Sequence, residues 1–114
     1  MRLRQNTGIT LQWIGWGKRG RVNIVEQPSG VYSLAGRQAG TAGASLVVDG
    51  VIAEVGKDYF VLDGVVAITD TPDEGRECGA DKSWRFEVTQ GRSYYRLREF
   101  EWCDGLTDYV DIYF

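Results

Sequence analysis

Residues 84–97 read WRFEVTQGRSYYRL, and this stretch decides the fold class. Its centre, Gln90-Gly91, separates two runs rich in aromatic residues, which are typical of β-strands. A two-residue turn there brings bulky side chains together on one apolar face: Trp84 opposite Leu97, and Phe86 opposite Tyr95. The stretch therefore predicts a β-hairpin with one face in a hydrophobic core.

The residues that follow extend this hairpin into a meander. A turn at Asp104-Gly105 adds a third strand to the same rows, with Ile112 beside Leu97, Phe114 beside Tyr95, and Arg98 facing Asp111. The alternative is a helix over residues 93–102, since Tyr94, Leu97 and Phe100 have helical spacing. Aromatic side chains disfavour a helix, so the meander is preferred.

Two further Asp-Gly pairs, Asp49-Gly50 and Asp63-Gly64, each stand between strand-like residues. Asp-Gly suits a type I′ turn because both central residues need positive φ. Each pair predicts a hairpin, and residues 56–58 predict a reversal between them. Earlier strands are expected in three ranges: residues 9–16, 21–26 and 31–35.

These elements predict a single all-β domain over residues 1–114. About eight to nine short hairpin-connected strands are too many for one flat sheet of this size. We therefore expect a small antiparallel barrel or sandwich, with a meander at the C-terminus. The segments 36–45 and 70–83 are expected to be long loops, and such loops are often functional.

The charge pattern limits the classes of partner. A net charge of −3 argues against nucleic-acid binding, and no apolar run is long enough to span a membrane. Residues 1–37 nevertheless carry six basic residues against Glu26 alone. This asymmetry leaves room for a minor basic patch around Lys18, Arg19 and Arg21. A protein or small-molecule partner is expected, and a homodimer is left open.

Cys78 and Cys103 are the two cysteines of the chain. Extending the Gln90-Gly91 hairpin brings them opposite one another, so we expect a disulfide. Polar residues follow Met1–Arg4 where a signal peptide needs an apolar stretch. The compartment then depends on the cysteines: extracytoplasmic if they are bridged, and cytoplasmic if they are free thiols.

Few catalytic constellations remain open, because the chain contains no histidine. This removes Ser-His-Asp and Cys-His nucleophiles and the commonest ligand of zinc. No cofactor motif is present, and we expect no cofactor and no enzymatic activity. Three carboxylates that the meander brings together offer a candidate cation site or a glycosidase-like acid pair: Glu101, Asp104 and Asp108.

The aromatic residues give the candidate binding sites. At the hairpin tip, Phe100, Trp102 and Tyr109 fall on the face opposite to the other apolar residues. Either a strong bend turns them into the core, or they form an exposed aromatic patch for a partner. A hollow interior lined by Trp13, Trp84, Tyr95 and Phe114 would instead indicate a small-molecule binder.

The leading hypothesis is a non-enzymatic protein-interaction or ligand-binding module. It would present the hairpin tip or the segments 36–45 and 70–83 to its partner. One alternative is a small-molecule-binding barrel, because a small aromatic-rich barrel resembles the ligand-binding proteins of the calycin group. The other is a carboxylate-based glycoside-processing enzyme.

Overall fold

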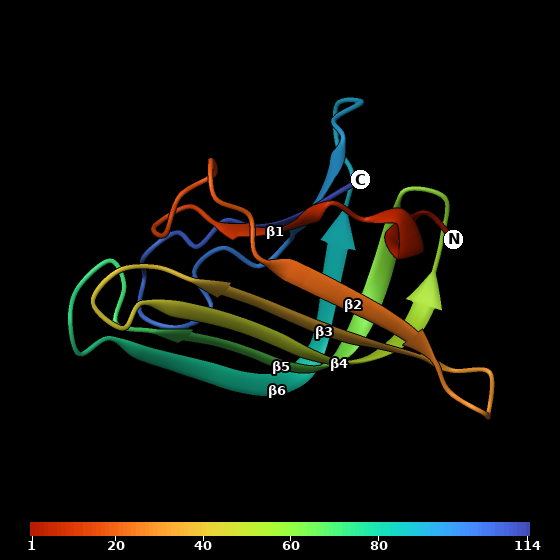
Figure 1. Cartoon of the computed structure of the whole chain (residues 1–114), viewed down its shortest axis with the longest axis horizontal. Coiled ribbons are helices and arrows are strands. Elements are labelled where there is room, and N and C mark those ends of the chain that lie inside the picture. The colour runs from red at the N-terminus through yellow and green to blue at the C-terminus, as the bar shows by residue number, and fades with distance from the viewer.

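The computed structural model describes residues 1–114 and is almost entirely antiparallel β-sheet (Figure 1). Eight strands form one sheet in the order β1-β8-β7-β6-β5-β4-β3-β2. A short 3₁₀-helix, Arg2–Gln5, precedes the strands. The strands are β1 (Gly8–Leu11), β2 (Arg21–Glu26), β3 (Tyr32–Ala39), β4 (Ser45–Val55), β5 (Tyr59–Thr69), β6 (Glu77–Glu87), β7 (Tyr94–Leu97) and β8 (Val110–Tyr113). The all-β prediction is confirmed.

The sheet curls until its two edge strands meet, which makes it a nearly closed barrel. A single bridge joins β1 to the start of β2: Ile9 and Gly20 exchange backbone hydrogen bonds of 3.0 and 2.8 Å. A Cβ atom on Gly20 would lie 1.8 Å from the carbonyl oxygen of Arg37. Only glycine fits at this point, because the backbone of β3 passes directly beside it.

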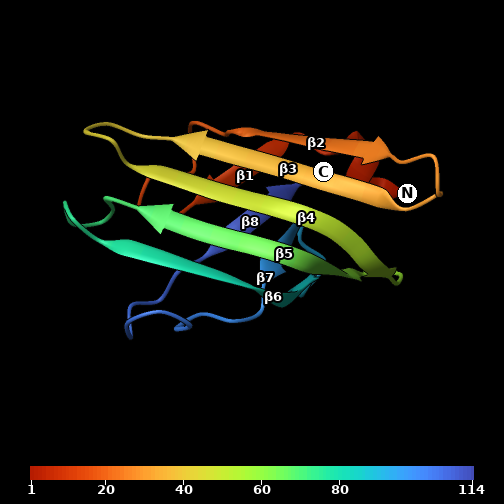
Figure 2. The same cartoon turned by 90° about the horizontal axis from the view of Figure 1, so that it is seen from below.

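The interior of the barrel is filled by side chains. Trp84, Phe60 and Phe86 are fully buried, and the Phe60 and Phe86 rings stack with their centroids 4.8 Å apart. Tyr95 meets Phe60 edge-on at 5.1 Å. Strands β2–β6 lie side by side beneath this core, and their other face is open to solvent (Figure 2). The core therefore occupies the space where a ligand cavity was an alternative.

Two of the predicted hairpins are wrong. Asp49-Gly50 lies inside β4 and Asp63-Gly64 lies inside β5, so four expected short strands are two long ones. Gly50 and Gly64 face each other across the two strands, and a Cβ on Gly50 would lie 2.2 Å from the Asp63 carbonyl oxygen. These glycines allow two backbones to approach closely rather than to turn. The reversal predicted at residues 56–58 is confirmed by a 2.9 Å bond from Gly56 N–H to Tyr59.

The C-terminal meander is confirmed in its strand order but not in its register. The turn at Gln90-Gly91 is present, with positive φ at both residues, and residues 94–97 form a strand rather than a helix. The pairs are shifted by two residues: Phe86 with Leu97, and Tyr95 with Ile112. A shift of two leaves each side chain on its predicted face. Residues 98–109 form a long loop instead of a hairpin, so Arg96, not Arg98, faces Asp111.

The remaining boundaries also differ. The strand expected at residues 9–16 ends at Leu11, and the one expected at 21–26 is confirmed. The strand expected at 31–35 runs from Tyr32 to Ala39. Both expected loops are therefore shorter than predicted: residues 40–44 and 70–76 lie between strands.

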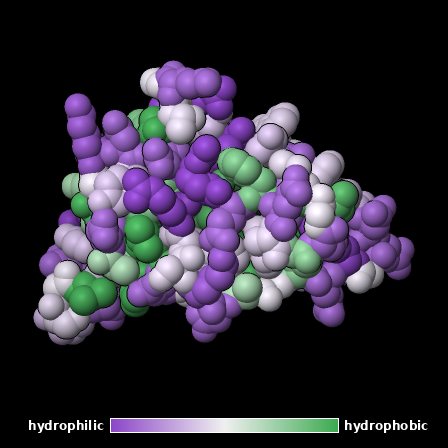
Figure 3. All heavy atoms as spheres, turned by 180° about the vertical axis from the view of Figure 1, so that it is seen from behind, coloured by the Kyte–Doolittle hydropathy of each residue, from purple (hydrophilic) through white to green (hydrophobic).

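No helix in the structure has the length and apolar character that a membrane crossing requires. The face turned away from the viewer of Figure 1 is largely hydrophilic, with separate small hydrophobic patches (Figure 3).

Candidate functional site

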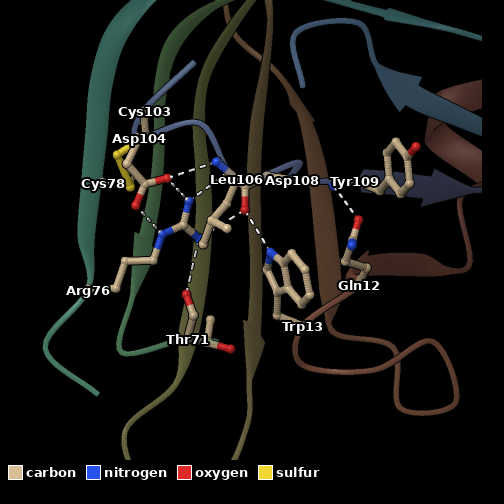
Figure 4. Close-up of polar contacts among 10 residues, drawn as sticks. All are labelled: Gln12, Trp13, Thr71, Arg76, Cys78, Cys103, Asp104, Leu106, Asp108 and Tyr109. Carbon is tan, nitrogen blue, oxygen red and sulfur yellow. Dashed lines mark hydrogen bonds and ion pairs between the residues drawn. A yellow bond between two sulfur atoms is a disulfide. The ribbon is translucent and has the colours of Figure 1, made fainter. Parts of the chain in front are cut away.

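Four loops gather at one end of the barrel, on the left in Figure 1. They are residues 12–19, 40–44, 70–76 and 98–109. We call this region the loop end. Its polar contacts are drawn in Figure 4.

Arg76 is the centre of the loop end. Its side chain is 6% exposed and uses every N–H of its guanidinium group. Nε and Nη2 donate to the two oxygens of Asp104 at 2.9 and 2.8 Å, while Nη1 and Nη2 donate to the two oxygens of Asp108, both at 2.9 Å. The second Nη1 hydrogen bonds the Thr71 carbonyl at 3.1 Å. This double bidentate geometry is the strongest arrangement that arginine forms with carboxylates.

Asp108 connects this arginine to an aromatic side chain. It is fully buried, and its Oδ1 also accepts a 2.8 Å hydrogen bond from the indole Nε1 of Trp13 (Figure 4). The side chain of Gln12 accepts a 3.0 Å bond from the backbone N–H of Tyr109. The residues after β1 are therefore tied to the C-terminal loop, and the orientation of the Trp13 indole is fixed.

The ion pair with Arg76 favours the charged form of Asp104. Hydrogen bonding to Asp108 and Asp104 raises the pKa of Arg76. The bond from Arg76 lowers the pKa of Asp104 below its usual value. The cation expected between Asp104 and Asp108 is replaced by this guanidinium group. Glu101 is exposed and makes no hydrogen bond or ion pair, so it does not join them.

We expect the Arg76–Asp104 ion pair to make the stability of the fold depend on pH in the acidic range. Because the folded-state pKa of Asp104 is lowered from 3.8, its stabilisation is complete above about pH 5 and is lost as the pH falls through the folded pKa. Wild type should therefore exceed Asp104→Asn in urea midpoint at about pH 6, and the gap should close towards about pH 2. Urea denaturation of both proteins across this range is the measurement. A difference between the two urea midpoints that stays constant over this pH range would contradict the prediction.

The expected disulfide is present at the same end. Cys78 and Cys103 are bonded, with their Cα atoms 5.8 Å apart. Cys78 lies on β6, whereas Cys103 lies in the loop 98–109 and not on a paired strand. The pairing was thus correct, although the extended hairpin from which it was inferred does not form. The disulfide holds this loop against β6, and Arg76 holds it against the loop 70–76.

A pocket of about 230 Å³ lies between the loops 40–44 and 70–76. Trp13 and Ile14 form an apolar wall, and Asp70 and Glu74 supply two carboxylates. None of its ten lining residues is basic. Trp13 is held by Asp108, and the neighbouring Thr71 is held by Arg76. An indole beside two carboxylates is an environment that favours a positively charged group.

The other predicted aromatic sites are part of the packed structure. Trp84 and Tyr95 belong to the core, and Trp102 packs edge-on against Trp84 at 5.1 Å. Phe100 and Tyr109 pack against each other at 5.5 Å. Trp102 therefore lies against the core, whereas Phe100 and Tyr109 are half-buried and lie beneath the guanidinium groups of Arg98 and Arg96. The interior cavity expected for a small-molecule binder is not present: no pocket is lined by Trp84, Tyr95 or Phe114.

Sequence reasoning singled out Trp13, Asp104 and Asp108 but missed Arg76, Asp70 and Glu74. Arg76 is the single basic residue in an acidic segment, DTPDEGRE, at residues 70–77. That contrast is a signal for an internal ion pair. Asp70 and Glu74 have no such signal in the sequence, because their position beside Trp13 depends on the tertiary fold.

The sequence of this chain is similar to that of one protein family. The model of the PM1083 family matches residues 1–114. A relative from Pasteurella multocida (strain Pm70), named as the uncharacterized protein PM1083, is 32% identical over 108 residues. The alignment covers 93% of this chain and 69% of that protein. No solved structure matches this chain.

Proposed function

This chain belongs to the PM1083 family, and from the site that its own residues form we propose that it is a non-enzymatic binding module. The proposed ligand is a lysine or arginine side chain of a protein partner. This side chain enters the pocket between Trp13, Asp70 and Glu74.

The charge of the pocket carries the proposal. Two carboxylates and an indole line it, and no basic residue neutralises them. Neither Asp70 nor Glu74 forms an ion pair within the chain, in contrast to Asp104 and Asp108. Oδ1 of Asp70 accepts a 2.8 Å hydrogen bond from the backbone N–H of Gly75. A cation over an indole gains about 0.5–2 kcal/mol, and the carboxylates add attraction. The volume of about 230 Å³ is suited to one long side chain.

A protein partner is favoured over a free small cation by the surroundings of the pocket. Glu77 is exposed at the start of β6, directly after the loop 70–76, so the acidic side chains of this segment continue past the residues that line the pocket. A basic peptide segment can use this whole surface, and charge complementarity of this kind speeds association.

The proposal that the module is not an enzyme is supported by the state of its carboxylates. A glycoside-processing pair needs one protonated acid beside one ionised carboxylate. Asp104 and Asp108 are instead both paired with Arg76, and the pKa of Asp104 is lowered rather than raised. This is the opposite of the shift that a general acid requires.

The disulfide supports an oxidising compartment as the place where the module acts. Disulfides persist mainly in extracytoplasmic environments, and Cys78–Cys103 is the only cysteine pair in the chain. The extracytoplasmic location is thus part of the proposal.

The test uses a fluorescently labelled peptide with three consecutive lysines, measured by fluorescence anisotropy. We expect Asp70→Asn and Glu74→Gln each to weaken binding by about fivefold, the loss of roughly 1 kcal/mol of charge attraction. Asp73→Asn is the matched control, because it removes the same charge from the same loop without touching the pocket. Its effect should stay within about twofold.

Two results would overturn the proposal. Wild-type protein that does not bind the peptide would remove the proposed ligand class. Equal weakening by all three variants would show that the peptide responds to net charge and not to the pocket.

A further inference from the structure

A second pocket, of about 410 Å³, lies on the outer face of β2 and β3. It shares no lining residue with the loop-end pocket. Glycine and alanine residues and two arginines line it. The lining residues are Gly20, Arg21, Asn23, Ala35, Arg37 and Ala39.

Arg21 and Arg37 are direct partners in the register of the two strands. Both side chains are exposed and lie on the same face. Like charges directly opposite each other on a sheet repel and destabilise it. Partners in such a position have Cβ atoms only about 5 Å apart, so both guanidinium groups reach the same space above the alanines.

No carboxylate of the chain forms an ion pair with either arginine; the acid on the same face of β4 is Asp49, which lies opposite Ala35, one row away from Arg37. Neither arginine forms an ion pair or a side-chain hydrogen bond, although Arg76 and Arg96 are both bound bidentately by aspartates. The register continues from Arg37 to Val47 on β4 and to Ala67 on β5, with no acidic residue in that row. The two positive charges are therefore left for a ligand from outside the chain.

We propose that Arg21 and Arg37 together bind a doubly charged oxyanion, the phosphate monoester group of a ligand. Each guanidinium group can donate two parallel hydrogen bonds to one edge of a tetrahedral oxyanion. Asn23 supplies a neutral polar side chain at the rim, and Ala35 leaves space beneath the anion. A bound anion offsets the repulsion between the two arginines, so binding also stabilises the folded protein.

Arg19 is close in the sequence but does not belong to this site. Its guanidinium group donates to the Thr7 hydroxyl at 2.6 Å and lies over the Tyr113 ring at 3.8 Å. Of the basic patch expected around Lys18, Arg19 and Arg21, the two arginines line a neighbouring pocket of about 300 Å³. Arg21 pairs with Arg37, which lies on the neighbouring strand.

The test is an NMR titration of the arginine Nε–H signals with inorganic phosphate, at constant ionic strength maintained with chloride. We expect saturable shifts of the Arg21 and Arg37 signals and a higher melting temperature in phosphate. Arg37→Ala should weaken phosphate binding about tenfold. The same variant should be at least as stable as wild type in chloride alone, because it removes the repulsion.

Arg98→Ala is the matched control, since Arg98 is an exposed arginine outside the pocket. It should leave phosphate binding unchanged. Glycerol 3-phosphate and vesicles of phosphatidylcholine with phosphatidic acid then distinguish a soluble phosphate ester from a lipid headgroup; tighter binding than inorganic phosphate in either arm supports the site. No shift at Arg21 and Arg37, or equal phosphate binding by Arg37→Ala, would overturn the proposal.

Discussion

Replacing Asp108 with alanine is expected to lower the free energy of unfolding by about 3–5 kcal/mol, the usual cost of removing one partner from a buried ion pair. Asp108 is fully buried and accepts two hydrogen bonds from Arg76 and one from Trp13. The variant leaves part of a buried guanidinium group and an indole N–H without acceptors. Urea denaturation near pH 7, followed by circular dichroism, measures the change.

Two further variants test the cause of this loss. Glu101→Ala removes a carboxylate from the same loop, but one that is exposed and unpaired, so its effect should stay within about 0.5 kcal/mol. The double variant Arg76→Met with Asp108→Leu removes both charges and should recover much of the lost stability. A loss below about 1 kcal/mol for Asp108→Ala would contradict the buried network.

Removing the disulfide is the second large effect. The double variant Cys78→Ala with Cys103→Ala is expected to lose about 3 kcal/mol, because the bond closes a loop across a sequence separation of 25 residues. A reductant should lower the urea midpoint of wild type towards that of the variant, and it should leave the variant unchanged.

A thiol titration in denaturant supplies the control for this experiment. Wild type should show no free thiol before reduction and two afterwards. Two free thiols in the untreated protein, or a wild-type midpoint that does not respond to the reductant, would contradict the disulfide. Either result would also remove the support for an oxidising compartment.

Local rules predicted the strands of the C-terminal third well and their register less well. Gln90 and Gly91 both have positive φ, as a two-residue type I′ turn requires. The register depends on where pairing resumes after the turn, and Arg92 and Ser93 remain outside the β6 ladder. The inward face was nevertheless correct, because a shift by an even number of residues keeps the side-chain parity.

The Asp-Gly pairs show where a local rule fails. The same dipeptide fits a tight turn and a close contact between two strands, and its own conformational preference does not distinguish them. Gly50 and Gly64 face each other, and either Cβ would collide with the backbone of the opposite strand. The need for glycine at both sites appears only once β4 and β5 are paired.

The loop-end site was the least predictable part, because its contacts are distant in the sequence. Arg76 binds carboxylates 28 and 32 residues away, and Asp108 binds an indole 95 residues away. Single-sequence patterns report neighbours along a strand or a helix and carry little information on such contacts. Trp13 was predicted as a binding residue, but the acids beside it come from a different loop.

The buried network and the pocket are connected through Trp13. Asp108 fixes the indole, and Arg76 fixes the backbone of Thr71 next to Asp70. Preorganised walls lower the entropic cost of binding a flexible side chain. The network therefore stabilises the fold and shapes the pocket at the same time.

The most direct measurement is an NMR titration of the protein with the trilysine peptide, in which the four tryptophan indole N–H signals are followed separately. We predict a saturable shift of the Trp13 signal together with the amides of residues 40–44 and 70–74, while Trp84 and Trp102, in or against the core, stay unchanged. An unmoved Trp13 signal, or shifts spread evenly over the acidic surface, would contradict a cation-binding pocket at the loop end.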